Sequence, residues 1–235
     1  MVKEAIVLAG GAGTRLRSVV ADVPKPLADI NGTPFLEYLL RYLERQGINT
    51  VVIAVSYMAD AIMDYCRRRR GSLQIRYSVE AAPLGTGGAI KQALTHTAFA
   101  ADDVFICNGD TFFDVSLSEL WQVHSVHQAD VTIALRRETD SRRFGSVICD
   151  PHTGRIVRFT EKGERSGGLI NGGVYVVKKQ RLSAFDGDVF SFEYDFLTHC
   201  CRDYLVMGKE FFGYFIDIGI PSDLYRAQDQ WRNME

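Results

Sequence analysis

The sequence contains neither a long apolar run nor a strong excess of charge. Its 235 residues include 27 Lys and Arg against 29 Asp and Glu, so the formal net charge is −2. Without a global basic field we expect no nucleic-acid or membrane partner, and any charge that binds phosphate must be local. The apolar run at residues 5–9 is too short for a signal peptide or a membrane span, and no small-residue cleavage site follows it. We therefore expect a cytoplasmic protein.

The sequence also lacks the cysteine patterns of a disulfide framework or a zinc site. No C-x-x-C pair occurs, and the count is odd, with cysteines at positions 66, 107, 149, 200 and 201. We expect reduced thiols in the core of a cytosolic protein. His124 and His127 share a predicted helix face, but no third metal ligand is evident. This favours surface histidines with hydrogen-bonded rings over a zinc site. No G-x-S-x-G nucleophile elbow is present, which argues against an α/β hydrolase.

No Pro/Ser-rich linker, repeat or low-complexity tract divides the chain, so we expect one domain over residues 1–235. In the first half, apolar strand-like runs alternate with helical patterns. The expected strands are residues 4–9, 50–56, 73–79 and 103–107. This alternation predicts an α/β fold with a mostly parallel sheet flanked by helices on both faces. The four arginines at 67–70 are predicted to be a solvated helix end, not a nucleic-acid patch.

The second half of the chain changes character. Two short apolar runs flank the turn at residues 150–154, which predicts a hairpin of residues 146–149 and 155–160. Further strands are expected at 130–136, 172–177 and 210–216, with helices at 116–128, 192–204 and 223–233. We expect this half to add a small β-rich, mixed-sheet elaboration on the substrate side.

A Gly-rich segment, residues 10–16 (GGAGTRL), follows the first strand directly. Glycines let the backbone approach a phosphate, and consecutive amides can form an anion nest. The spacing matches neither the P-loop nor the dinucleotide fingerprint. However, Arg15 follows at once, and Lys25 stands between Pro24 and Pro26, which stiffen the backbone around it. Together these residues predict the cationic half of a polyphosphate site.

The order of the motifs resembles the sugar-1-phosphate nucleotidyltransferase family over nearly the whole chain. The motifs are GGAGTRL at 10–16, PKP at 24–26, LGTGGA at 84–89, NGD at 108–110, EK at 161–162, NGG at 171–173, FE at 192–193 and FIDIGIP at 215–221. Among its members, the fine pattern is most similar to that of bacterial D-glycero-α-D-manno-heptose 1-phosphate guanylyltransferases. The resemblance implies a Rossmann-like fold with a nucleotide-binding half at 1–115 and a sugar-phosphate-binding half at 116–235.

The implied reaction joins a nucleoside monophosphate to a sugar 1-phosphate and releases pyrophosphate, for bacterial surface glycan synthesis. Two anions must meet, so catalysis depends on positioning and charge neutralisation, for which a hard divalent cation is suited. Asp110 follows a strand at the carboxyl edge of the predicted sheet, and Asp217 is a lone carboxylate in an apolar run. The resemblance makes both of them Mg²⁺ ligands, and makes Arg15, Lys25 and Asp110 the catalytic residues.

The resemblance also assigns substrate contacts, residue by residue. Contacts to the nucleotide fall on Leu8, Ala9, Gly10, Gly11, Gly13, Thr14, Arg15, Lys25, Glu80, Gly85, Thr86, Asn108, Gly109 and Asp110. Contacts to the sugar phosphate fall on Thr111, Gly145, Glu161, Lys162, Asn171, Gly172 and Glu193.

Glu80 stands where the family reads the base edge. A carboxylate can accept both adjacent donors of guanine, whereas uracil and thymine present one donor between two carbonyls, so GTP is favoured. Mannose 1-phosphate, N-acetylmuramate 1-phosphate with UTP, and a non-catalytic nucleotide-sugar-binding regulatory subunit are the alternatives. A homo-oligomer is left open.

Overall fold

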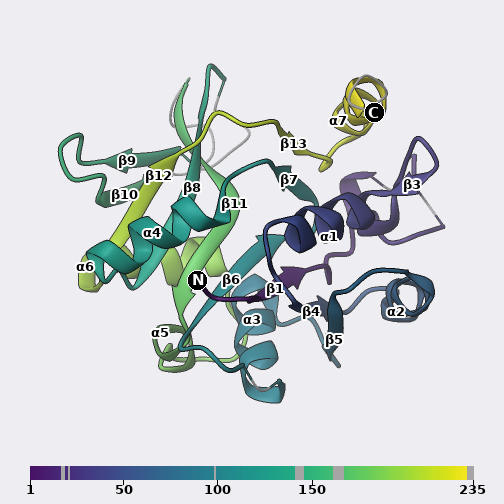
Figure 1. The fold of residues 1–235 in the computed structure, drawn as a ribbon, viewed down its shortest axis with the longest axis horizontal. Coiled ribbons are helices and arrows are strands. Elements are labelled where there is room, and N and C mark those ends of the chain that lie inside the picture. The colour runs from purple at the N-terminus through teal and green to yellow at the C-terminus, as the bar shows by residue number, and fades with distance from the viewer. Residues whose placement is uncertain (17–18, 21, 98, 141–145, 161–166, 232–235) are drawn as a thin grey trace.

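The computed structural model describes the chain except residues 17–18, 21, 98, 141–145, 161–166 and 232–235. Within the described residues, one large mixed sheet runs through the molecule in the strand order β10-β9-β11-β6-β1-β4-β5, and β8 joins β11 to β12 (Figure 1). The parallel part consists of β1 (Glu4–Leu8), β4 (Thr50–Val55), β5 (Gln74–Val79) and β6 (Asp103–Asn108).

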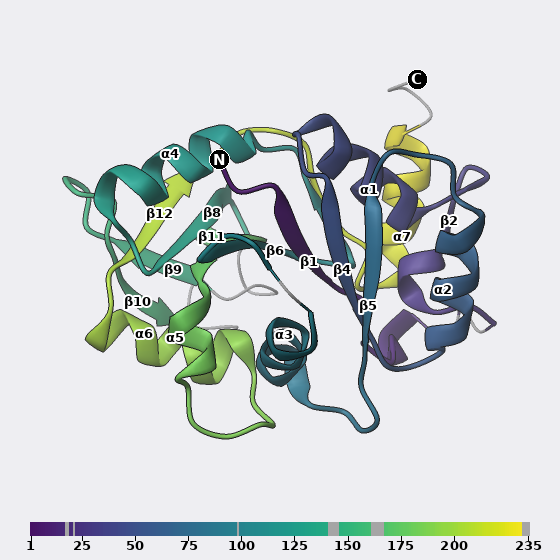
Figure 2. The same cartoon turned by 60° about the horizontal axis from the view of Figure 1, so that its bottom comes forward.

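Helices cover both faces of this sheet, as the sequence predicted (Figure 2). The helices α1 (Phe35–Arg45), α4 (Leu117–His127) and α7 (Pro221–Trp231) contribute to one hydrophobic cluster. The helices α3 (Gly85–His96), α5 (Lys179–Ser183) and α6 (Thr198–Asp203) contribute to the other. β1 alternates between the two, since Ala5 and Val7 lie in the first cluster and Ile6 in the second. The strand is therefore apolar from Ala5 to Leu8.

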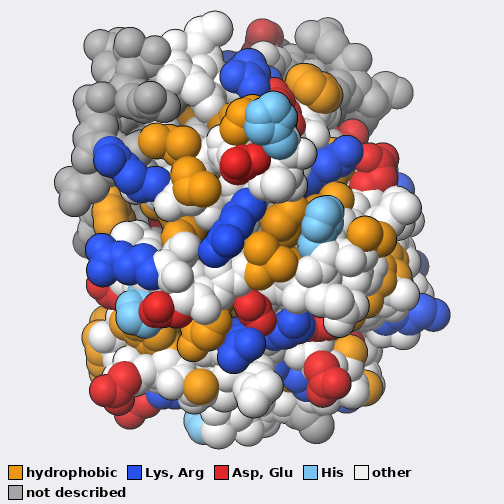
Figure 3. All heavy atoms as spheres, turned by 90° about the vertical axis from the view of Figure 1, so that its left-hand side faces the viewer, with side chains coloured by type: hydrophobic (Ala, Val, Ile, Leu, Met, Phe, Trp, Pro, Cys, Tyr) orange, Lys and Arg blue, Asp and Glu red, His pale blue; other side chains and the backbone are white. Residues whose placement is uncertain are grey.

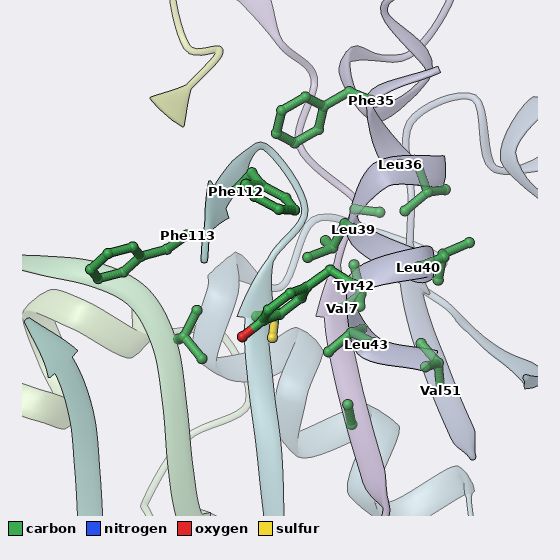
Figure 4. Close-up of a cluster of buried hydrophobic side chains, with 14 of the residues drawn as sticks. Val7, Phe35, Leu36, Leu39, Leu40, Tyr42, Leu43, Val51, Phe112 and Phe113 are labelled. Atoms are coloured by element: carbon green, nitrogen blue, oxygen red, sulfur yellow. The ribbon is translucent and has the colours of Figure 1, made fainter. Parts of the chain in front are cut away.

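The first cluster is centred on α1, whose apolar residues recur at helical spacing. Leu36, Leu39 and Leu43 are buried against the sheet beside Val7 and Val51 (Figure 4). The ring of Tyr42 is buried too, and its hydroxyl donates to the carbonyl of Val115 at 2.8 Å. This packing holds α1 against β1 and β4.

The second half of the chain extends the sheet with mixed pairing, which confirms the predicted elaboration. Its strands are β8 (Val131–Glu138), β9 (Ser146–Cys149), β10 (Ile156–Thr160), β11 (Gly168–Lys178) and β12 (Val206–Glu210). β11 is antiparallel to β6, β8 and β9, and β9 and β10 form the predicted hairpin. The long β11 thus joins the nucleotide half directly to the second half.

One predicted element of the second half is wrong, and another differs in its helix type. The single strand at 210–216 is in fact the end of β12 followed by β13 (Phe215–Asp217), which pairs with β7 (Thr111–Phe113) in a separate two-stranded sheet. The chain turns between them at Gly213, where a β-carbon would collide with the carbonyl oxygen of Asp114. The helix predicted at 192–204 is confirmed, but its first part is a π-helix, η3 (Phe192–Leu197), which continues into α6.

Short elements connect these parts. They are the 3₁₀ turns η1 (Thr14–Leu16) and η2 (Lys25–Leu27), the strands β2 (Asp29–Ile30) and β3 (Thr33–Pro34), and the helix α2 (Ala59–Arg68).

Across the described residues, no helix combines the length and apolarity needed to cross a bilayer. On the face at the left of Figure 1, basic side chains are interspersed with acidic and apolar ones (Figure 3).

Two predicted surface groups are buried. The side chain of Arg69 is only 5% exposed and pairs with Glu37 at 3.0 Å and Glu44 at 2.9 Å, so the arginine run is not simply a solvated helix end. His124 is 2% exposed and hydrogen-bonds the hydroxyl of Thr132 at 2.9 Å, so it is not a surface histidine. The five cysteines are free, and three of them are buried.

Candidate active site

A cleft of about 1410 Å³ opens along the carboxyl ends of the parallel strands. Most of the residues predicted to contact substrate line it. They are Leu8, Ala9, Gly10, Gly11, Arg15, Lys25, Glu80, Gly85, Thr86, Asn108, Gly109, Asp110, Thr111, Asn171, Glu193 and Asp217. Gly13, Thr14 and Gly172 lie outside this lining, and Gly145, Glu161 and Lys162 lie outside the described residues. The cleft exceeds the roughly 300–1,000 Å³ typical of a single small-ligand pocket, so it has room for two substrates.

The Gly-rich loop forms one wall of the cleft, and two of its glycines are required by close contacts or backbone geometry. A β-carbon on Gly10 would lie 2.6 Å from Oε1 of Glu80. Gly13 has a φ of +58° and accepts a hydrogen bond from the N–H of Leu16 at 2.9 Å, which starts η1. This turn places Arg15 on the cleft wall with its side chain exposed.

Lys25 and the two aspartates meet at the centre of the cleft. η2 begins between the two prolines, and Nζ of Lys25 donates to Oδ2 of Asp110. The side chain of Lys25 is 10% exposed and that of Asp110 is 38% exposed. Pairing of β7 with β13 sets Thr111 opposite Asp217, and the N–H of Ile218 donates to the carbonyl of Asp110 at 3.0 Å. The separate small sheet is therefore what brings the carboxylates together.

The electrostatics of this pair suit a divalent cation. Burial, and then the neighbouring charge of Asp110, raise the pKa of Asp217 to about 6, while Lys25 acts in the opposite direction. The N–H of Gly219 donates to Oδ1 of Asp217 at 2.6 Å, which orients the carboxyl. Mg²⁺ commonly binds through one or two carboxylates together with substrate phosphates and water, and two carboxylates lining an open cleft fit that pattern.

Glu80 stands at the other side of the Gly-rich loop, one residue beyond β5. Its backbone N–H donates to the carbonyl of Val55 at 2.9 Å, and its Oε2 accepts the N–H of Leu84 at 3.0 Å. Burial raises the pKa of Glu80, and the Leu84 hydrogen bond opposes that rise. Because Gly10 has no side chain, Oε1 can lie directly against the loop. The carboxylate is thus fixed as an acceptor at the predicted base end.

The opposite end of the cleft carries a hydrogen-bonded cluster on β11 and η3. Nδ2 of Asn171 donates to the hydroxyl of Tyr175 at 2.8 Å, and that hydroxyl donates to Oε1 of Glu193 at 3.3 Å. The β11–β8 register shifts between Asn171 and Tyr175, and such bulges re-aim side chains next to active sites. Gly173, at φ +75°, packs against the amide of Asn108, which joins the cluster to the end of β6.

Gly172 has a different role from the predicted contact. A β-carbon there would lie 2.5 Å from the ring of Phe113, so the glycine permits β11 to pack on β7. Its contact with the sugar phosphate stays a prediction that its position does not support.

Several residues that line or support the cleft were not predicted from the sequence. Tyr175 could have been found, because it shares strand parity with Asn171 and therefore its face. Tyr57 and Arg158 also line the cleft but stand in segments with no recognisable motif. Tyr194 and Thr198 were hidden because a regular α-helix would not direct both of them to the same place as Glu193.

Known proteins resemble this chain over nearly its whole length. The Nucleotidyl transferase family matches residues 4–233. A D-glycero-α-D-manno-heptose 1-phosphate guanylyltransferase of Aneurinibacillus thermoaerophilus is 44% identical and covers 97% of both chains. A protein of the same name from Campylobacter jejuni subsp. jejuni serotype O:2 is 42% identical over 94% of this chain and 97% of its own.

More distant relatives and a solved structure complete the comparison. The mannose-1-phosphate guanyltransferase of Aspergillus oryzae is 31% identical over 94% of this chain and 62% of its own length. The crystal structure of HddC from Yersinia pseudotuberculosis complexed with GMP-PN superposes with a TM-score of 0.85 at 37% identity, covering 98% of this chain and all of that one. The chain belongs to the nucleotidyl transferase family.

Proposed function

We propose that the protein transfers GMP from GTP to D-glycero-α-D-manno-heptose 1-phosphate and releases pyrophosphate, for bacterial surface glycan synthesis in the cytoplasm. The observation that carries this proposal is the arrangement along one cleft. Asp110 and Asp217 line the same cleft as the Gly-rich loop, Glu80, Asn171 and Glu193, and Tyr175 links the last two. The full-length similarity to two heptose 1-phosphate guanylyltransferases supports the choice of substrates.

Each group of residues has a role in bringing two anions together. The Gly-rich loop and Arg15 hold the β- and γ-phosphates and stabilise the leaving pyrophosphate. Lys25 neutralises charge near the α-phosphate, which the oxygen of the sugar phosphate attacks in line. Asp110 and Asp217 would hold Mg²⁺, which neutralises phosphate charge when bound. Asn171 and Glu193 orient the sugar hydroxyls, so the nucleophile is positioned before the attack.

Glu80 selects the base by its acceptors. A carboxylate oxygen has more than one lone pair, so Glu80 can hold the N–H of Leu84 and still accept the N1–H and 2-amino group of guanine. Uracil and thymine would bring a carbonyl against the same carboxylate. GTP is therefore preferred over UTP.

Pyrophosphate release from a panel of substrates tests this function. The panel combines four nucleoside triphosphates with the heptose, mannose and N-acetylmuramate 1-phosphates, in Mg²⁺ and in EDTA. We expect the highest kcat/KM for GTP with the heptose 1-phosphate, and turnover only with Mg²⁺. A preference for mannose 1-phosphate or for UTP would replace the proposed substrates. No turnover with any pair would favour the non-catalytic regulatory subunit.

The same assay tests whether Glu80 recognises the guanine base. Glu80→Gln places an amide donor among the donors of guanine, so kcat/KM for GTP should fall roughly 10- to 100-fold. Glu119→Gln, on an exposed position of α4, is the isosteric control and should not change it. Equal activity of the Glu80 and Glu119 variants with GTP would remove Glu80 from base recognition.

A further inference from the structure

The π-helix η3 and Thr198, the first residue of α6, direct three polar side chains into the cleft. Glu193, Tyr194 and Thr198 all line the cleft, while Phe192, Phe196 and Leu197 of the same segment are buried. A π turn brings residues i and i+5 together, and the hydroxyl of Thr198 donates to the carbonyl of Glu193 at 3.3 Å. On an α-helix of 3.6 residues per turn, these two positions would point in different directions. π turns are frequent at functional sites.

The segment is held rigidly where it meets the nucleotide half. The N–H of Phe192 donates to the hydroxyl of Thr86 at 2.9 Å, and the carbonyl of Phe190 accepts the N–H of Gly87 at 3.0 Å. The ring of Phe192 stacks on Phe196 at 5.4 Å between centroids. Ser191 caps the helix by accepting the N–H of Tyr194 at 3.1 Å. Tyr194 and Thr198 are thus presented from a fixed backbone, which lowers the entropy lost on binding.

A chain of contacts leads from the aspartates along the cleft to Glu193, next to these two hydroxyls. The cluster runs from Asn108, beside Asp110, through Asn171 and Tyr175 to Glu193. Tyr194 of η3 follows Glu193 in the chain, and Thr198, the first residue of α6, bonds the carbonyl of Glu193; both side chains are exposed, Tyr194 at 53%. A sugar whose anomeric phosphate lies at the aspartates would therefore point its most distant hydroxyls toward them.

We propose that Tyr194 and Thr198 determine sugar specificity by hydrogen-bonding the C7 hydroxyl of the heptose, which accepts from the Tyr194 hydroxyl and donates to the Thr198 oxygen, since the Thr198 hydroxyl itself donates to the carbonyl of Glu193. This inference rests on the proposed function, and it concerns the one chemical difference between two candidate substrates. D-glycero-D-manno-heptose is mannose with one more CHOH unit on the exocyclic carbon, the end remote from the phosphate. An apolar pocket distinguishes one extra carbon by only about 10- to 200-fold, whereas polar groups placed to bind a hydroxyl discriminate more strongly.

Two substitutions that remove only a hydroxyl group test the inference. Tyr194→Phe and Thr198→Val should each lower kcat/KM for the heptose 1-phosphate about tenfold, because each removes one substrate hydrogen bond. With mannose 1-phosphate, the change should stay within about twofold, since that sugar lacks the additional hydroxyl. The ratio of heptose to mannose activity should therefore fall in both variants.

Two matched controls separate this effect from a general loss of hydroxyl groups. Tyr225→Phe changes an exposed tyrosine on α7, and Thr95→Val removes a helix threonine hydroxyl that bonds the carbonyl of Lys91 at 3.0 Å. Both controls should leave the ratio and the activity unchanged. Thermal melts and GTP-binding titrations of all four variants should match the wild type.

The outcomes distinguish this inference from the proposed function. An unchanged ratio in both the Tyr194 and the Thr198 variant, or an equal loss with both sugars, overturns the inference while wild-type turnover of the heptose upholds the function. A wild-type protein that does not turn over the heptose 1-phosphate overturns the function and the inference with it. A lower ratio in these two variants alone supports both.

Discussion

Burial of the Asp217 carboxyl lowers the stability of the folded protein at neutral pH. Its pKa is raised from an ordinary 3.8 to about 6, first by burial and then by the charge of Asp110. Because the folded protein holds this proton more tightly than the unfolded chain, ionisation of Asp217 opposes folding. The cost begins as the pH rises above about 4 and is complete above about 6. A carboxylate held in this way is suited to a cation that compensates it.

Asp217→Asn should therefore stabilise the metal-free protein while removing its activity. The amide oxygen can still accept the N–H of Gly219, and the ionisation cost disappears. At pH 7.5 we expect a gain on the order of 1–2 kcal/mol, or about 3–6 °C in Tm, and almost none at pH 4. Thermal melts in EDTA at the two pH values measure this difference. A gain of equal size at both pH values would show that ionisation is not its cause.

At the residue scale, the sequence predicted side chains that carry chemistry better than side chains that carry structure. Arg15, Lys25, Asp110 and Asp217 stand in short, distinctive motifs, and all four line the cleft. His124 stands in no such motif. Its hydrogen-bond partner Thr132 lies on the next strand, β8, and nothing in the sequence around His124 predicts that it is buried there. Burial depends on distant partners, which periodicity alone does not reveal.

At the element scale, Arg69 fastens the end of α2 to α1. Its guanidinium bonds Glu37, which is 7% exposed, and Glu44, which is 26% exposed. The hydroxyl of Tyr65 donates to the same Glu37 at 3.0 Å, and Arg41 pairs with it at 2.9 Å. This network sets the position of α2, which follows the cleft residues Ser56 and Tyr57.

Arg69→Ala should destabilise the protein by about 3 kcal/mol, because it leaves the carboxylate of Glu37 buried with only its exposed partner Arg41 and Tyr65. Arg70→Ala, at the exposed neighbouring position, should change stability by no more than about 0.5 kcal/mol. Urea denaturation at neutral pH measures both. If the two variants unfold at the same midpoint, the Arg69 network does not contribute to stability.

The sequence predicted best those elements that are buried against apolar neighbours on every side. β1 and β4 are covered on both faces, so their continuous apolar runs identify them. The segment from β12 to β13 reads as one strand because Phe211, Phe212 and Tyr214 are all apolar or aromatic, yet Gly213 turns it. The π turn of η3 is also invisible in the sequence, since its hydrogen-bond shift depends on packing against α3.

At the scale of the whole molecule, the cleft depends on both halves of the chain. β6 supplies the strand that leads to Asp110, and β13 supplies Asp217 from more than 100 residues later. A ligand that engages both aspartates therefore links the end of β6 to β13 and should stabilise the fold. The formal net charge of −2 offers no general attraction for a triphosphate, so this stabilisation must come from the local site.

The pairing of Lys25 with Asp110 predicts that metal and nucleotide bind cooperatively. A cation alone must compete with the ammonium group for Asp110, whereas a triphosphate offers Lys25 another anion. Mg²⁺ alone should therefore barely change Tm. Mg²⁺ with a non-hydrolysable GTP analogue at about 100 times its Kd should add about 2.7 kcal/mol, or roughly 5–10 °C.

EDTA, and the substitution Asp110→Asn, should each abolish the part of this Tm shift that requires the metal. Asp110→Asn should also abolish metal-dependent turnover while the melt of the unliganded protein stays cooperative. Asp114→Asn, at an exposed carboxylate four residues away, is the control and should keep the wild-type shift. A full nucleotide shift in EDTA, or an unchanged Mg²⁺ response in the Asp110 variant, would show that this carboxylate does not hold the cation. Because the measurement needs no turnover, it tests the metal site independently of which sugar the enzyme prefers.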